Sequence, residues 1–485
     1  MRRNRAGHNA AHNAGYFDRG LLMDETVARE EEAADVGILL AWASSAARRE
    51  AHVLPPHVIR KALTVICDDI AAMVAASSEP EIQKVNALAV SKAPNGGSTL
   101  ISDPTRHVGR EWAATANAIA ANWLELDGGY RLATCHGSLY TLPSALAELE
   151  SSGGTVGDLI TALVCSYEVV TRVARAYRPT LPLAAHPHAT LSPLGAAAAI
   201  AAARKLDDNT FAEIVLSAAT FSLNGPFSHA QQGATIRNGW AGAGAQLGFL
   251  AADLVQAGIS GSNTALHDVF GTSYGYPENT AALTEGLGDR YAIEDGYHKL
   301  YACCQYLHSS VEAAYQLTQS GLKDVAVSDI VHINVETHPL ARELRSKYPF
   351  TVLGGKFSLP HAVAAVLATG SFAPDVFSGE FLQDPNVQAL RDKVRISEWD
   401  ALPEPPEDRP AKITVTLRDG TTREQSVLSA IGGSDRPLAQ EQLMSKFETL
   451  TASRHPHFAS VAQTFIGTEN PNLDMPLSEF LSALL

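Results

Sequence analysis

Apolar residues recur every three or four positions along most of the first half of the chain, from Val36 to about residue 260. The clearest run starts at Thr155, which forms a capping-box pattern with Asp158. Its regularly spaced apolar positions are Leu159, Leu163, Tyr167, Val170, Ala174 and Tyr177. Such spacing places one apolar stripe on one face of a helix. The first half of the chain is therefore predicted to be all-α.

Two further helical runs are rich in small residues. One covers Leu194 to Ala203 and the other covers Ala241 to Val255. The second run contains Gly242, Gly244 and Gly248, which have no side chain. We therefore expect another helix or a ligand to approach closely along this run.

After about residue 290 the pattern changes to a period of two, which is typical of strands. Val331, Ile333 and Val335 alternate with polar residues, and residues 413–417 do the same. The second alternation ends at Asp419-Gly420, a pair that favours a hairpin turn. This region is predicted to be α+β.

A helix is expected between these two strands. Ser358 is a suitable N-cap, Pro360 fits the first turn, and Gly370 suits the end. Together the patterns predict a mainly α protein with a disordered tail (1–35), a helical domain (36–294), an α+β domain (295–430) and C-terminal helices (431–485).

Composition narrows the classes of function. The 485 residues suggest two domains, and the formal net charge of −15 argues against a nucleic-acid partner. No apolar run approaches the length of a membrane span. The five cysteines show no CxxC spacing and no His/Cys cluster, which predicts a reducing cytoplasm without structural zinc or an iron–sulfur site.

The richest polar turn is ELDGGYRLATCHGS, residues 125–138. Asp127 follows one helical run and His136 precedes the next, so both can face one cavity. A carboxylate there can fix the tautomer of an imidazole that transfers protons near neutral pH. The alternative is a capped turn, in which Asp127 and Ser138 bond nearby backbone N–H groups. Because such turns are common, these residues alone favour the capped turn.

Three other segments contain candidate polar residues. HPHATLSPLG, residues 186–195, places His186, His188 and Thr190 before a helix, where an anion can bind, although a histidine-capped turn fits equally well. GATIRNGWAG contains Arg237, which suits a carboxylate unless it faces solvent. YHKLYACCQYLHSS contains Lys299 and His308 around an apolar centre.

Taken in order, these segments resemble the MmgE/PrpD family, which includes 2-methylcitrate dehydratase, cis-aconitate decarboxylase and iminodisuccinate epimerase. The resemblance covers roughly residues 36–450. The matching segments are NAIAANWLELDGGY with CHGS, HPHATLSPLGAAAA, ATIRNGWAGAGAQLG, YHKLYACCQYLHSSVEA, GGKFSLPHAVAAVLATG, and TVTLRDG with PLAQEQLMSKF.

The resemblance implies a large helical domain formed by both ends of the chain, with an inserted α+β lid. It also implies a homodimer and an active site between domain and lid that needs no metal and no cofactor. The implied catalytic residues are Asp127, His136, His186, Lys299 and His308. The implied substrate-binding residues are Arg237, Tyr130, Thr190, Ser358 and His361.

The chain departs from the family pattern at several positions. Gly128 replaces a second acid, Asn122 replaces a histidine, and Arg237 replaces a lysine. His136 is followed by Gly-Ser rather than by the usual Pro-Gly or Ser-Gly. Since arginine stays protonated, Arg237 keeps the charge but cannot donate a proton. These changes leave the substrate open.

The family chemistry shares proton transfer at a carbon alpha to a carboxylate. We expect Arg237 and Lys299 to bind carboxylates, with His136 and His186 as base and acid. We also expect His136 and Lys299 to be partly solvated in an open cleft. The main prediction is a 2-methylcitrate dehydratase-like lyase acting on a small polycarboxylate. The alternatives are an epimerase, a decarboxylase, or a degenerate binding protein.

Overall fold

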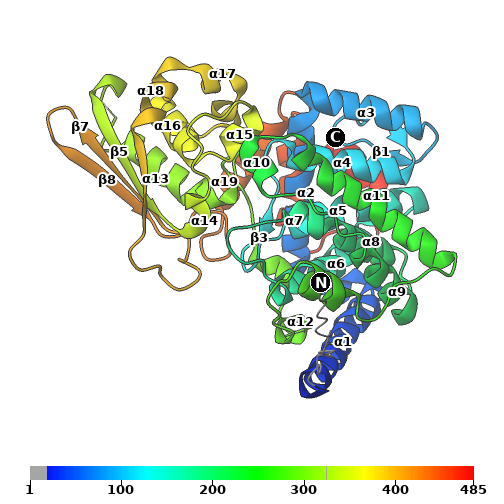
Figure 1. Cartoon of the computed structure of the whole chain (residues 1–485). Helices are drawn as coiled ribbons and strands as arrows, with labels where there is room; N and C mark the ends of the chain where they lie inside the picture. Colours follow the sequence, from blue (N-terminus) through cyan, green and yellow to red (C-terminus); the bar gives the residue numbers. More distant parts are fainter. Residues whose placement is uncertain (1–18, 324) are drawn as a thin grey trace, which may run out of the picture.

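The computed structural model describes residues 19–323 and 325–485, and helices dominate it, as predicted (Figure 1). A larger helical part and a smaller part that contains a sheet lie side by side. The helical part includes α1 (Arg19–Ala47), α2 (Pro56–Ala75), α3 (Pro80–Lys92), α4 (Arg110–Trp123), α5 (Gly137–Ser152), α6 (Val156–Ala176), α7 (Pro187–Thr190), α8 (Ser192–Ala203), α9 (Asp208–Ala219), α10 (Ser228–Gln232), α11 (Ile236–Gln256) and α12 (Ala281–Thr284).

The predicted tail over residues 1–35 lies partly outside the described residues. Its described portion is not a tail, because α1 begins at Arg19. Glu32 on this helix is buried and accepts a hydrogen bond from the hydroxyl of Tyr177. Among the side chains of α1 that the structure describes, Val36 is the first buried apolar one.

Helix α8 lies at the centre of the helical part. Residues 192–202 are all buried, and the helix packs against α5, α6, α9 and α11. The glycines of α11 allow this packing: a Cβ on Gly244 would lie 2.1 Å from Ser192 Oγ, and one on Gly248 would lie 2.6 Å from Ala196 Cβ. The predicted close approach is therefore confirmed, and the approaching partner is a helix.

The smaller part contains one four-stranded sheet in the order β6-β5-β7-β8. The central pair is antiparallel, with Val335 opposite Ile413, and β6 runs parallel to β5. Its strands are β5 (Ile330–Thr337), β6 (Val394–Glu398), β7 (Ala411–Leu417) and β8 (Thr422–Val427), and its helices are α13 (His308–Gln319), α14 (Pro339–Arg342), α15 (Val352–Lys356), α16 (Leu359–Thr369), α17 (Gly379–Gln383) and α18 (Pro385–Lys393).

Both predicted strands are confirmed, but one predicted face is wrong. Ile333 and Val335 are buried, whereas Val331 is exposed and Ile330 is buried in its place. The reason is a register shift between Ile330 and His332, which moves the alternation by one residue.

The C-terminal helices α19 (Gln440–Thr451), α20 (Phe458–Gly467) and α21 (Leu477–Leu484) contact the helical part, where α19 and α20 pack on α2. Lys446 on α19 places Nζ 2.5 Å from Asp68 Oδ1, and Asp68 Oδ2 lies 2.8 Å from His298 Nδ1. This buried network joins both ends of the chain to the segment that contains Lys299.

Two pairs of very short strands also occur in or beside the helical part. Strand β1 (Ser98–Thr99) pairs with β2 (His107–Val108), and β3 (Gly129–Tyr130) pairs with β4 (Gly296–Tyr297). The five cysteines are free and buried. In the described part of the chain, no helix is both long enough and apolar enough to cross a membrane.

Candidate active site

The polar turn between α4 and α5 is held in place by the pairing of β3 with β4. A Cβ on Gly129 of β3 would lie 2.2 Å from the Tyr297 hydroxyl oxygen, and one on Gly128, which precedes β3, would lie 2.9 Å from the Tyr297 carbonyl oxygen. Glycine at both positions therefore allows the close pairing. The turn therefore brings Asp127 and His136 beside the segment that carries Lys299.

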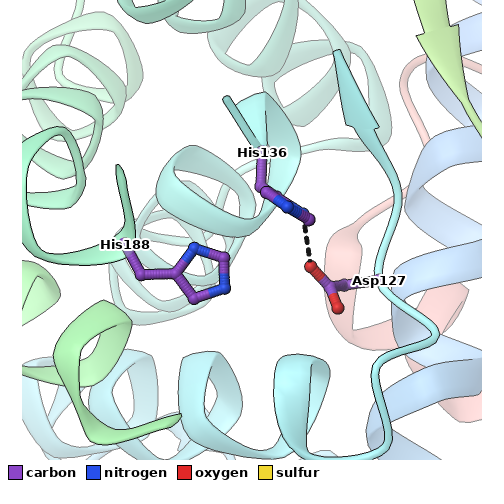
Figure 2. Close-up of side chains that lie close together, drawn as sticks. All are labelled: Asp127, His136 and His188. Atoms are coloured by element: carbon purple, nitrogen blue, oxygen red, sulfur yellow. Dashed lines mark ion pairs between the residues drawn. The ribbon is translucent and has the colours of Figure 1, made fainter. Parts of the chain in front are cut away.

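Asp127 and His136 contact each other through their side chains, which is one of the two arrangements considered from the sequence. Nδ1 of His136 lies 2.6 Å from Asp127 Oδ2 and 2.9 Å from the Gly128 carbonyl oxygen (Figure 2). Both neighbours are acceptors, so Nδ1 carries a proton and Nε2 is the atom that can exchange one. Because Asp127 contacts side chains and bonds no backbone N–H in the described residues, the capped-turn alternative is wrong for Asp127.

Lys299 lies on the other side of Asp127, with Nζ 3.6 Å from Oδ1. Both side chains are fully buried. Burial opposes ionisation of Asp127, but the positive charges of Lys299 and His136 outweigh it and hold the pKa of Asp127 below its ordinary value. Burial likewise opposes the charge on Lys299, while Asp127 and Glu125 raise its pKa above the ordinary value. The expectation that Lys299 is partly solvated is therefore wrong.

Glu125 is a site residue that the sequence reasoning missed. It is buried, it binds Arg237 Nη1, and its Oε2 accepts a hydrogen bond from Lys299 Nζ at 3.3 Å. Its φ of 58° is the left-handed conformation, which costs a non-glycine residue free energy and is concentrated at functional sites. The one available signal was its place two residues before Asp127.

His186 is buried between two hydrogen-bond donors. Its Nδ1 accepts from the backbone N–H of His188 at 3.1 Å, and its Nε2 faces Arg237 Nε at 3.2 Å. Burial and then the charge of Arg237 hold its pKa well below the ordinary value. His186 is therefore held in its neutral form, and both of its ring nitrogens face protein groups, which argues against the predicted role of general acid.

One group of possible metal ligands lies within the site. Single ligand atoms of Asp127, His136 and His188 lie within 4.8 Å of one another, and Figure 2 shows His188 facing the same space. Nδ1 of His188 bonds the Tyr140 hydroxyl at 2.8 Å. However, the Lys299 ammonium already occupies the free side of Asp127, so the charge environment does not favour a divalent cation.

A second such group lies away from the site, beside α1. His267 Nδ1 is 3.0 Å from Glu32 Oε2 and 2.9 Å from Glu278 Oε1. The other ring nitrogen of His267 accepts from Arg29 Nε at 3.1 Å. Two carboxylates thus face one ring nitrogen of His267 and the Arg29 guanidinium faces the other, so protein groups lie on both sides of the ring.

The cavity at this site is small and is lined by both parts of the chain. Its volume is about 30 Å³, against roughly 300 Å³ or more for an ordinary ligand pocket. Of the predicted residues, His136, His186, Arg237, Lys299 and Tyr130 line it, with Asp127 directly behind. The lining residues that the sequence reasoning missed include Glu125, Tyr297, Gln305, Tyr306, Phe357 and Arg409.

Four predicted residues do not line this cavity. Nε2 of His308 bonds the Cys303 carbonyl oxygen at 3.2 Å, and burial lowers its pKa to about 3. Ser358 caps α16 by accepting the His361 N–H at 3.1 Å, as predicted for the helix but not for substrate binding.

His361 and Thr190 also lie elsewhere. His361 Nδ1 is 3.4 Å from Arg391 Nη1, and burial with the charge of Arg391 lowers its pKa to about 4. Thr190 is buried on α7, and its carbonyl oxygen accepts from Ser222. The sequence resemblance located these residues on the right elements but could not show which way their side chains point.

Comparison with known proteins places this site in a family. Residues 41–281 match the MmgE/PrpD N-terminal domain, and residues 301–466 match the MmgE/PrpD C-terminal domain. A cis-aconitate decarboxylase-like protein of Aspergillus oryzae is 26% identical over 435 residues, which cover 82% of this chain and 87% of that protein.

Two further relatives are cis-aconitate decarboxylases. The Aspergillus terreus enzyme is 26% identical over 443 residues, covering 85% of this chain and 88% of its own length. The Mus musculus enzyme is 24% identical over 417 residues, covering 80% and 82%. The two domain matches and these relatives confirm the predicted resemblance, and the chain is an enzyme of the MmgE/PrpD family.

Proposed function

We propose that the protein is a lyase that removes CO2 from an unsaturated polycarboxylate of the cis-aconitate type. The resemblance alone favoured a dehydratase, but the relatives described above are named as decarboxylases or decarboxylase-like. The observation that carries the proposal is His136, whose Nδ1 faces two acceptors while Nε2 is free of hydrogen bonds to the described residues. Such a histidine can deliver a proton to carbon.

In the proposed reaction the bond between a carbon and one carboxylate breaks, and the electron pair remains on the conjugated carbon skeleton. His136 gives the proton on Nε2 to that skeleton, so that one CO2 leaves and one proton is consumed. Lys299 is close enough to Asp127 and Glu125 to be held rigidly, and its charge stabilises the anionic transition state. Asp127 stabilises the protonated form of the imidazole.

We further propose that the smaller part is a lid over the helical domain. A cavity of about 30 Å³ does not admit a polycarboxylate, so the two parts must separate for binding. Opening would break two contacts of the Arg131 side chain. One is with the carboxylate of Asp408, and the other is with the carbonyl oxygen of Pro406. A homodimer, a reaction without metal or cofactor, and a cytoplasmic location belong to the same proposal.

The deciding experiment is a substrate panel followed by NMR, containing cis-aconitate, citrate, 2-methylcitrate and iminodisuccinate. We expect CO2 release from cis-aconitate and no reaction of 2-methylcitrate. Dehydration of 2-methylcitrate would instead favour the dehydratase, and inversion of iminodisuccinate would favour the epimerase.

His136→Gln then tests the assigned proton donor. We expect kcat to fall by about two to four orders of magnitude with a smaller change in KM, because proton transfer is lost while substrate contacts remain. His332→Gln, at an exposed histidine of β5, is the matched control and should keep full activity. Near-normal turnover of His136→Gln together with a lower melting temperature would refute the assignment.

A further inference from the structure

The charges that line the cavity are not evenly paired. Lys299 is 3.3 Å from Glu125 Oε2 and 3.6 Å from Asp127 Oδ1, and Arg237 binds the other oxygen of Glu125. Two cations are therefore already neutralised by two carboxylates. The predicted carboxylate-binding role of Arg237 and Lys299 has to compete with these buried pairs.

Arg409, which lies two residues before β7, has no such carboxylate partner in the part of the chain that the structure describes. Its side chain is buried, and no carboxylate of the described residues lies within ion-pair distance of its guanidinium. Nη1 donates to Gln305 Oε1, and Nη2 donates to the Arg131 carbonyl oxygen at 3.3 Å. The guanidinium carbon Cζ lies over the Tyr306 ring, 5.3 Å from the ring centroid. Nε has no hydrogen-bond partner.

The nearest acid does not balance this charge. The carboxylate of Asp408 binds Arg131 Nη2, so that these two neutralise each other. Arg409 is thus left with neutral partners only. A buried guanidinium without an anion is unfavourable, and an anionic ligand that reaches it recovers part of the desolvation cost.

We propose that Arg409 is the residue that binds a carboxylate of the substrate, using the free Nε edge of its guanidinium. It lines the same cavity as His136 and Lys299, and it comes from the smaller part of the chain. A bound carboxylate would therefore link the smaller part to the helical part. The inference rests on the proposed function only for the substrate class, a small polycarboxylate.

The test uses unreactive ligands, so that it does not depend on catalysis. Calorimetry measures the Kd of propane-1,2,3-tricarboxylate, of glutarate, which lacks its central carboxylate, and of methylsuccinate, which lacks a terminal one. Arg409→Gln should raise the Kd of the tricarboxylate by about 30- to 1000-fold. One of the two dicarboxylates should be insensitive to the change, because it lacks the group that Arg409 binds.

The matched control is Arg391→Gln, which removes another buried arginine with an unpartnered Nε outside the cavity. It should leave all three Kd values unchanged. Arg409→Lys keeps the positive charge but loses the planar guanidinium, so it should recover part of the affinity. This variant replaces Arg409→Gln in the test if Arg409→Gln does not fold.

The proposal is overturned if Arg409→Gln binds the tricarboxylate as the wild type does, if all three ligands weaken equally, or if the wild-type protein binds none of them. Kinetics separate this failure from failure of the proposed function. Decarboxylation of cis-aconitate with an unchanged KM in Arg409→Gln refutes only the role of Arg409. Binding that depends on Arg409 without any decarboxylation refutes only the reaction.

Discussion

Replacing Lys299 with methionine should destabilise the protein, because it removes the cation between two buried carboxylates. The Nζ–oxygen distances of 3.3 and 3.6 Å to Glu125 and Asp127 correspond to about 5 kcal/mol of attraction each at an effective dielectric constant of about 20. The variant no longer has to bury an ammonium group, and the desolvation cost that it avoids offsets part of the lost attraction. We therefore expect a net loss of about 3 to 5 kcal/mol in the free energy of unfolding.

The loss should depend on pH in a defined direction. In the wild type the pKa of Asp127 is below its ordinary value, so its contribution to stability is present above the unfolded value and is lost as pH falls. In Lys299→Met the burial of Asp127 remains while its largest favourable charge is gone, so its pKa should rise. The deficit should consequently be larger at pH 8 than at pH 5.

Urea denaturation of both proteins at pH 5 and pH 8 measures this difference. Lys412→Met is the control, because the Lys412–Glu336 pair at 3.2 Å is partly exposed and should contribute under about 1 kcal/mol. A Lys299→Met protein with wild-type stability at both pH values would show that Lys299 is not a paired buried cation.

Two other predictions concern the same region. Burial and the nearby Asp68 raise the pKa of Asp69 to about 7, above its unfolded value of about 3.9. The contribution of Asp69 to stability is therefore present at acid pH and is lost as pH rises through about 7. Asp69→Asn should therefore gain stability over the wild type at pH 8 but not at pH 4, as thermal melts would show; an equal difference at both would contradict it. EDTA should leave turnover unchanged, because Lys299 occupies the side of Asp127 where a cation would bind. Activity that is lost on adding EDTA and restored by a divalent ion would contradict this prediction.

The predicted active-site residues differed in how far sequence could place them. Asp127 and His136 are nine positions apart on one turn, so local chain geometry already limited how they could meet. Whether they contacted each other or the backbone depended on β4, which supplies Tyr297 from more than 150 residues away. His308, Ser358 and His361 lie on the expected segments, yet their side chains bond within their own surroundings rather than at the cavity.

The sequence by itself determined the helical character, the main strands and the family, because these depend on residue spacing along the chain and on ordered motifs. It also identified α11 as a closely packed helix, since glycine spacing is a local property. The tertiary structure alone decided the charge balance of the site. Glu125, Arg237, Lys299 and Arg409 come from distant segments, and the pairing of buried charges depends on distances that no local pattern encodes.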